Sequence, residues 1–429
     1  GRHWTRSPVP GATDCTGGPA GAAVDPSLAF GPGGRVAASE SWITSSTQVG
    51  INHDDIRMFV GRSDDGGRTF APAVEPEPTQ PDQRGFISFD PARPGHLDVE
   101  TERSPFIGGP LGTYIYGAPG SIVIVGSDDG GRSYGAPVQV FSTLPGTTAL
   151  AAGLLRSGPD LVAIIGTVSD SQLPILLLGH PVPQRIIAVR SGDGGRSFGA
   201  AVDVGTFYFG NNLTNCCLPQ AAVAPDGTMY VTWPDGPGGS VVLARSLDHG
   251  QNWATRSALT TAHGATMPSV AVAGDGTVGL FYYDVVPHGS HASDANLTPY
   301  VATSRDGATG WTTVPLGRAF DLAAIKGGNA DQFSVGPYQG MIGLPLGFGV
   351  SVTLGAPYAP ASQERVWYVE VSSGADAGPI VQGATVMGLP DTGAGGPWAG
   401  LAWTFMGALA VVLARRRARR WAPGAKAAP

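Results

Sequence analysis

The 429-residue sequence predicts an all-β fold, a β-propeller most simply built from six blades, on two observations. One turn motif, Ser-x-Asp-x-Gly-x-x-aromatic, recurs along the chain. The composition is also rich in turn formers, with 65 glycines and 37 prolines against 14% charged residues. Such a chain is typical of a turn-rich fold with a core and not of a disordered protein. Seven blades are the alternative.

The five copies of the motif begin 64, 64, 55 and 58 residues apart. A unit of about 60 residues accommodates one four-stranded blade with its loops. Ser and Asp can bond nearby backbone groups, Gly supplies a positive φ, and the aromatic residue starts the returning strand. We therefore interpret each copy as a structural clip. The clip residues are Ser63, Asp65, Gly67 and Phe70; Ser127, Asp129, Gly131 and Tyr134; Ser191, Asp193, Gly195 and Phe198; Ser246, Asp248, Gly250 and Trp253; and Ser304, Asp306 and Trp311.

Further blade parts surround these clips. Residues 25–30, 219–224 and 268–273 are apolar or alternating runs that end in turn residues, which is typical of a strand and its hairpin. The fifth clip has Ala308 in place of the expected Gly, so its turn should be altered. A sixth unit without a clip runs from about residue 331 to 373. The expected domains are thus an N-terminal segment at 1–20 and the propeller at 21–373.

The C-terminal part has a different composition. Residues 374–397 form a predicted linker that contains Leu389, Pro390, Asp391, Thr392 and Gly393. An apolar run follows at 398–414, and an arginine-rich tail at 415–429. The run is at the short end for a membrane-spanning helix, and the tail would stay on the cytoplasmic side. We expect this anchor helix to hold the propeller outside the cell.

The pentapeptide resembles the Leu-Pro-any-Thr-Gly sorting signal of Gram-positive surface proteins. In those proteins a sortase cleaves between Thr and Gly and links the Thr to the cell wall. The resemblance implies an exported protein at the cell wall or cell surface, with sortase and peptidoglycan as partners. The alternative is a plain C-terminal membrane anchor. A signal peptide is expected to lie outside this sequence.

The charge of the body limits its partners. Six of the 26 basic residues and none of the 33 acidic ones lie in 415–429, so residues 1–414 carry a formal charge of −13. Such an acidic surface disfavours nucleic acid and anionic lipid.

Three cysteines are candidates for a disulfide. Cys216 and Cys217 are neighbours, and their Cα separation of about 3.8 Å is too short for an unstrained bond between them. An exported protein would more readily pair Cys15 with one of them and leave one thiol. Three buried thiols are the alternative.

The repeated motif resembles the Asp box of the sialidase superfamily, over about residues 20–372. The resemblance implies the propeller but not an activity, because Asp boxes also occur in propellers that bind without catalysis. Sialidases carry an Arg-Ile-Pro motif in the first strand, and Val24 occupies that arginine position here. The stretch around Glu40 and Trp42 likewise lacks an arginine that the family often has.

The resemblance also suggests catalytic candidates. Asp55, or Asp54 beside it, precedes a strand as the general acid of the family does, and Tyr338 is the best match for the nucleophile. No glutamate occurs between Glu102 and Glu364, so the glutamate that activates this tyrosine in sialidases is missing from its usual place.

Polar residues in the loops that lead into the blades are the candidates for a binding face. They are Asp82, Arg84, Glu102, Arg103, Asn211, Asn212, His263 and Asp331. No zinc, nucleotide or serine-hydrolase motif is present, and no cofactor is expected beyond the structural calcium that propellers can hold. The sequence therefore favours a surface propeller that binds glycan or protein without sialidase turnover. The alternatives are an exo-acting glycoside hydrolase and a structural envelope protein.

Overall fold

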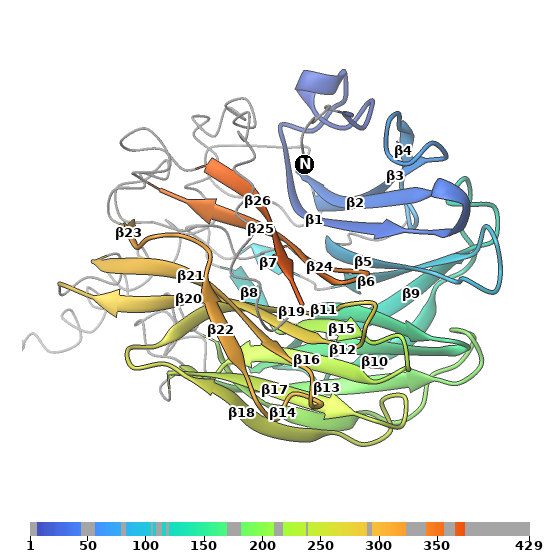
Figure 1. The fold of residues 1–429 in the computed structure, drawn as a ribbon. Helices are drawn as coiled ribbons and strands as arrows, with labels where there is room; N and C mark the ends of the chain where they lie inside the picture. Colours follow the sequence, from blue (N-terminus) through green and yellow to red (C-terminus); the bar gives the residue numbers. More distant parts are fainter. Residues whose placement is uncertain are drawn as a thin grey trace, which may run out of the picture.

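The computed structural model describes residues 7–43, 56–78, 83–103, 106–108, 114–116, 120–169, 182–209, 218–236, 239–289, 294–322, 340–355 and 365–373. Six antiparallel sheets are arranged around a common axis, each as one blade (Figure 1). The all-β class and the six-bladed count are confirmed. Within these ranges the helical elements are two short 3₁₀ turns, η1 (Asp14–Thr16) and η2 (Pro32–Gly34). The predicted anchor helix lies outside the described residues.

The strands of each blade follow one another along the chain. Blade 1 holds β1 (Ala22–Phe30), β2 (Val36–Ile43), β3 (Ile56–Ser63) and β4 (Ala71–Val74). Blade 2 holds β5 (Gln83–Phe89), β6 (Leu97–Arg103), β9 (Ser121–Ser127) and β10 (Val138–Ser142), with the hairpin β7 (Phe106–Gly108) and β8 (Tyr114–Tyr116) inserted after β6. Blade 3 holds β11 (Thr147–Ser157), β12 (Asp160–Ser169), β13 (Val182–Ser191) and β14 (Val202–Phe209).

Blade 4 holds β15 (Gln220–Val223), β16 (Met229–Pro234), β17 (Ser240–Ser246) and β18 (Ala254–Thr260). Blade 5 holds β19 (Ala265–Val272), β20 (Val278–Pro287), β21 (Ala295–Ser304), β22 (Thr312–Pro315) and β23 (Phe320–Asp321). Blade 6 holds β24 (Met341–Leu344), β25 (Gly347–Leu354) and β26 (Arg365–Ser372). The first strand of each blade is innermost, and these strands pack in the order β1, β5, β11, β15, β19, β24. We call the end at which the inner strands begin the front, and the opposite end the back.

The Asp-box turns join the third and fourth strands of blades 1 to 5 at the back. In blade 2, Asp129 accepts hydrogen bonds from the Ser127 hydroxyl at 2.8 Å, from the Arg132 N–H at 2.8 Å, and from the Ser133 N–H and hydroxyl at 2.9 and 2.6 Å. The bonds satisfy backbone groups that the tight turn would otherwise leave unpaired. In the fifth turn Ala308 adopts φ +67°, and Asp306 keeps its bonds to Ser304, Thr309 and Gly310.

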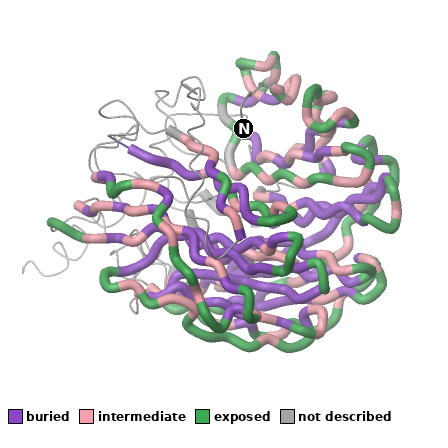
Figure 2. The backbone as a smooth tube through the Cα atoms, in the orientation of Figure 1, coloured by how far each residue is buried: buried purple, intermediate pink, exposed green. Residues whose placement is uncertain are grey.

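Buried apolar side chains pack between neighbouring blades. Figure 2 shows that most of the buried residues lie along the strands. Trp233 between blades 3 and 4 is 1% exposed, and its indole N–H donates to the Thr206 carbonyl at 3.0 Å. Truncation of such a side chain to alanine costs about 3–5 kcal/mol. On blade 1, Trp42 stacks on Phe59 with ring centroids 3.7 Å apart, and the N-terminal residues Val9, Ala12 and Ala20 cover the pair.

Candidate functional site

Three inner strands carry a strained residue near the front. Asp25, Arg84 and Met267 are not glycines, yet they adopt φ values of +51°, +48° and +51°. Each lies where the pairing of its strand shifts register in a β-bulge. Bulges re-aim side chains, and non-glycine residues in this region of φ persist only where the surrounding structure holds them. The front therefore positions these side chains at some cost in backbone energy.

Arg84 lies between two acidic side chains from different strands. Its guanidinium nitrogens are 3.9 Å from Asp25 Oδ2 and 3.6 Å from Glu102 Oε2. The backbone N–H of Arg84 donates to the Ser41 hydroxyl at 2.8 Å. The Ser39 hydroxyl donates to the backbone carbonyl of Gly85 at 2.7 Å. The side chains of Arg84 and Asp25 are 21% and 23% exposed. This ion pair is thus fixed at the seam of blades 1 and 2 and remains accessible.

Two glutamates extend this network into the protein. Glu102 is fully buried, and its Oε2 accepts the N–H of Ala151 from blade 3 at 3.2 Å. Glu100, two residues earlier on the same face of β6, is also fully buried, and neither of its carboxyl oxygens has a hydrogen-bond partner among the residues that the structure describes. Burial raises the pKa of Glu100 well above its usual value, and the charge of Glu102 raises it further. Burial of Glu100 therefore favours its neutral, protonated form.

A second charged cluster lies at the back, between blades 2 and 3. Arg156 from β11 lies 3.5 Å from Asp90 and bonds Asp98, and its side chain is 4% exposed. His96 contacts Asp98 at 3.2 Å and Asp128 at 2.6 Å. The hydrogen bond to Asp98 raises the pKa of His96, which favours its charged form. These contacts join blades 2 and 3 and bury Arg156, Asp98 and His96, whereas the side chain of Asp128 is 87% exposed.

The other described candidates have structural partners. Arg103 forms a two-fold ion pair with Glu77, which is 6% exposed, and its Nε lies 3.0 Å from Glu77 Oε2. His263 lies at the front of blade 5, 4.0 Å from Asp284. Burial raises the pKa of Asp284. The structure therefore brings Arg84 and Glu102 together, with Arg103 and His263 in separate pairs.

Many residues proposed from the sequence lie outside the described ranges. They are Asp54, Asp55, Asp82, Asn211, Asn212, Cys216, Cys217, Asp331, Tyr338, the sorting signal 389–393 and the segment 398–429. Cys15 is described, exposed and free. Among the residues with defined positions, no cluster of three or more His, Cys, Asp or Glu is arranged to hold a metal ion, and no helix is long and apolar enough to cross a membrane.

Two participants in the network were missed by sequence reasoning. Asp25 was placed in the first strand, but its role beside Arg84 depends on the bulge. Glu100 alternates with apolar residues in Leu97–Arg103, a pattern that predicts a half-exposed strand. The charged face is instead buried because it packs against blade 3.

No protein-family profile matches the chain, and no curated protein sequence matches it. Several solved structures resemble its fold. The Hadza microbial sialidase Hz136 aligns with a TM-score of 0.49 and 16% identity over 78% of this chain, which spans 63% of that protein. The leech intramolecular trans-sialidase aligns at 0.48 and 11% over 82% of this chain and 68% of that one. The α-L-arabinanase of Penicillium chrysogenum aligns at 0.45 and 12% over 81% of this chain and 93% of that one.

Proposed function

We propose that this chain is a cell-surface propeller that binds a glycan at its front without sialidase turnover, and that the glycan is uncharged. The observation that carries the proposal is the position of Arg84 between Asp25 and Glu102. A lone guanidinium attracts a sugar carboxylate, but here two carboxylates already surround it, so an acidic sugar would be repelled. Sugar hydroxyls can accept from Arg84 and donate to Asp25 without this repulsion.

The mid-propeller carboxyls do not favour hydrolysis. A glycosidase needs an acid and a base or nucleophile that reach the scissile bond. Burial favours the protonated form of Glu100, which a general acid needs, but the side chain is fully buried and cannot contact a substrate. We therefore prefer binding over turnover.

Binding can be tested on an array of neutral and sialylated glycans with the labelled full chain. We expect at least one neutral glycan to bind, and Arg84→Met to weaken that binding at least tenfold, because a charge-assisted hydrogen bond is lost. Arg185→Met is the matched control, since Arg185 on blade 3 is 65% exposed and forms a surface ion pair with Asp203. Binding restricted to sialylated glycans, or to proteins, would contradict the proposal.

Turnover is tested separately with a fluorogenic sialoside. We expect no hydrolysis above background by the full chain. Robust hydrolysis that disappears in Tyr338→Phe would establish the hydrolase and overturn the binding-only proposal.

We also propose that a sortase joins Thr392 to peptidoglycan, which would place the propeller on the outer surface of a Gram-positive cell. The support is the order of pentapeptide, apolar run and basic tail. Thr392→Ala should move the protein from the wall fraction to the membrane or the medium. Unchanged wall attachment would refute this route.

A further inference from the structure

The first described residues of the chain form a short segment that lies on blade 1 (Figure 1). We call residues 7–20 the latch. It contains the η1 turn and has backbone hydrogen bonds of its own. The Gly11 N–H donates to the Thr16 carbonyl at 3.0 Å, and the Asp14 N–H donates to the Ala20 carbonyl at 3.1 Å. The latch is therefore a folded unit that docks on the blade as a whole.

The latch contacts blade 1 through apolar side chains. Ala12 and Ala20 are 4% and 0% exposed, and they pack in one cluster with Trp42 of β2, which is 3% exposed. Val9 lies against Gly61 of β3, so close that a Cβ on Gly61 would be 2.8 Å from Val9 Cγ1. Removal of this apolar surface from water favours the docked latch.

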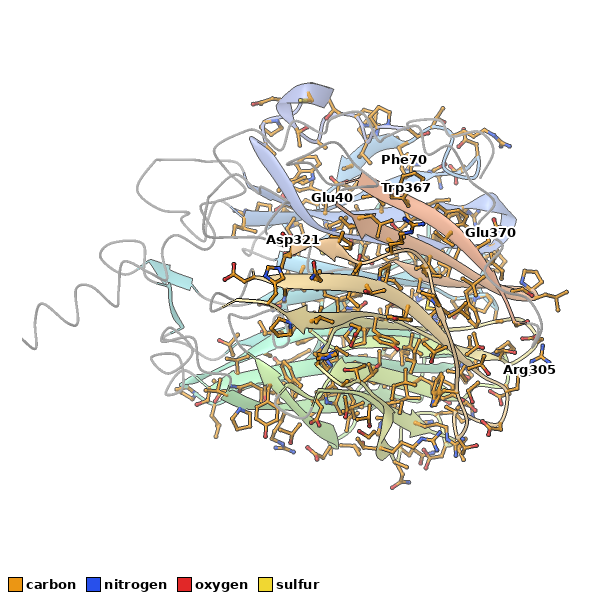
Figure 3. The ribbon with its side chains drawn as sticks, turned by 60° about the vertical axis from the view of Figure 1, so that its left-hand side comes forward. Glu40, Phe70, Arg305, Asp321, Trp367 and Glu370 are labelled. Atoms are coloured by element: carbon orange, nitrogen blue, oxygen red, sulfur yellow. The ribbon has the colours of Figure 1, made fainter. Side chains whose placement is uncertain are left out.

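Strand β2 lies between the latch and the front site. Successive side chains of a strand point to opposite faces of its sheet. Trp42, and by this alternation Glu40 (labelled in Figure 3), are on the face where the latch docks. Ser39 and Ser41 are on the other face, toward blade 2, and are 0% and 1% exposed. One strand therefore connects the latch to blade 2.

The two serines of β2 contact both strained residues of the Arg84 site. Ser41 accepts the backbone N–H of Arg84 at 2.8 Å, and Ser39 donates to the carbonyl of Gly85 at 2.7 Å. The bulge that contains Asp25 lies where β1 pairs with Ser39 and Ser41. Non-glycine residues at positive φ persist only where surrounding contacts hold them. Strand β2 supplies such contacts on the face opposite the latch.

We propose that the docked latch positions Arg84 through β2 and thereby regulates the affinity of the front for its glycan. The docked latch fixes Trp42, so Ser39 and Ser41 stay in place against β5. Release of the latch frees β2, and the strained backbone of Arg84 then relaxes. The effect on affinity rests on the proposed function, whereas the coupling between the latch and Arg84 does not.

Hydrogen exchange of the full chain without glycan tests the coupling. Val9→Asp places a charge against Gly61 and should release the latch, so the Gly11 amide should exchange about tenfold faster or more. We expect the Arg84 amide to accelerate by a similar factor, with the amides of blades 3 and 4 unchanged. Leu144→Asp is the matched control, because Leu144 is 81% exposed, and it should change neither amide.

Two further variants separate the coupling from a general loss of stability. Val9→Ala removes two methyl groups from the same contact and replaces Val9→Asp if that chain unfolds. Ser41→Ala should accelerate the Arg84 amide and leave Gly11 unchanged, because it breaks the connection beyond the latch. In the double variant with Val9→Asp, Arg84 should exchange no faster than in Ser41→Ala alone.

Faster exchange of Gly11 with unchanged exchange of Arg84 would overturn the proposal. So would a latch that stays protected in both Val9 variants, because the contact with Gly61 would then not hold it.

Glycan binding gives a second measurement on the same variants. Val9→Asp should weaken binding of the glycan that the wild-type chain recognises, and saturating glycan should slow exchange of the Gly11 amide, because coupling between two sites is reciprocal. Unchanged affinity in a Val9→Asp chain whose Arg84 amide exchanges faster would overturn the regulatory role. A wild-type chain that binds no glycan would refute the proposed function and leave the exchange results unaffected, so the two failures are distinguishable.

Discussion

The neutral state of Glu100 predicts how the stability of the propeller depends on pH. In the unfolded chain this carboxyl ionises near its ordinary pKa of 4.5, whereas burial keeps it protonated in the folded protein to much higher pH. Above pH 4.5 the unfolded state therefore releases a proton that the folded state retains. Burial of Glu100 therefore destabilises the protein least below pH 4.5. As the pH rises above this value the free energy of unfolding decreases, until the carboxyl of the folded protein also ionises.

The slope follows from linkage. A difference of one proton between the two states changes the free energy of unfolding by about 1.4 kcal/mol per pH unit. Between pH 5.5 and 7.5 the wild-type chain should lose up to about 2.7 kcal/mol through this group, or about 5 °C in Tm at about 2 °C per kcal/mol. Glu100→Gln cannot ionise and removes that slope, although its buried amide adds a constant cost of about 1–3 kcal/mol.

The assay is thermal or denaturant unfolding of wild type and Glu100→Gln at half-unit pH steps. The stability of the variant relative to wild type should rise with pH. Glu370→Gln is the control, because Glu370 is exposed on β26, and it should follow the wild-type profile. A constant difference between Glu100→Gln and wild type from pH 5.5 to 7.5 would refute the assignment of a neutral buried acid.

Two further predictions concern the frame of the propeller. Hydrogen bonds from the Ser133 hydroxyl and N–H hold the pKa of Asp129 well below 3.8 in the folded protein. The Asp129 carboxylate therefore stabilises the folded state above pH 3.8, and this stabilisation is lost as the pH falls through the pKa of the folded state. Asp129→Ala should lower Tm at pH 7, and the difference from wild type should shrink below pH 3 in the same melts. Gly343→Ala places a methyl group 1.9 Å from the Val272 carbonyl oxygen, so it should lower Tm strongly by separating blades 5 and 6. Among the described residues, the methyl group of Gly340→Ala meets Ser351 at an ordinary 3.4 Å, so this change should have little effect.

The fold could be predicted because the residues that define each blade turn are close together in the sequence. Each Asp box contains within one turn the serine, aspartate and glycine that make its hydrogen bonds, so a repeated spacing was enough to find five of six blades. The sixth blade shows the limit. Ser372 has the register of a box serine but lacks the aspartate, and only strand pairing reveals the equivalence.

The site was less predictable because the positions and burial of its side chains depend on residues far away in the sequence. Arg84 and Glu102 could be named as polar residues at the blade entries, but the loop positions expected for them were wrong, because Arg84 lies within β5 and Glu102 within β6. The positive φ of Arg84 and its position beside Asp25 depend on a bulge and on the packing of two blades. The burial of Glu100 depends on blade 3, which begins more than forty residues later at Thr147. A period of two indicates which side chains share a face but not whether that face meets water or protein.

The three acids on one face of β6 account for the pairing of the two described arginines beside them, Arg84 and Arg156. Asp98 is neutralised by Arg156 at the back, and Glu102 is stabilised by Arg84 and by the Ala151 N–H at the front. Glu100 between them has no such partner and avoids the cost of a buried charge by staying protonated. Arg84 must therefore balance both Glu102 and Asp25. A ligand carboxylate would have to displace one of these acids, and displacement of the buried Glu102 would leave its charge uncompensated at a cost of about 3–5 kcal/mol. A neutral glycan avoids this cost, which is why the proposed ligand has hydroxyl groups and no acidic group.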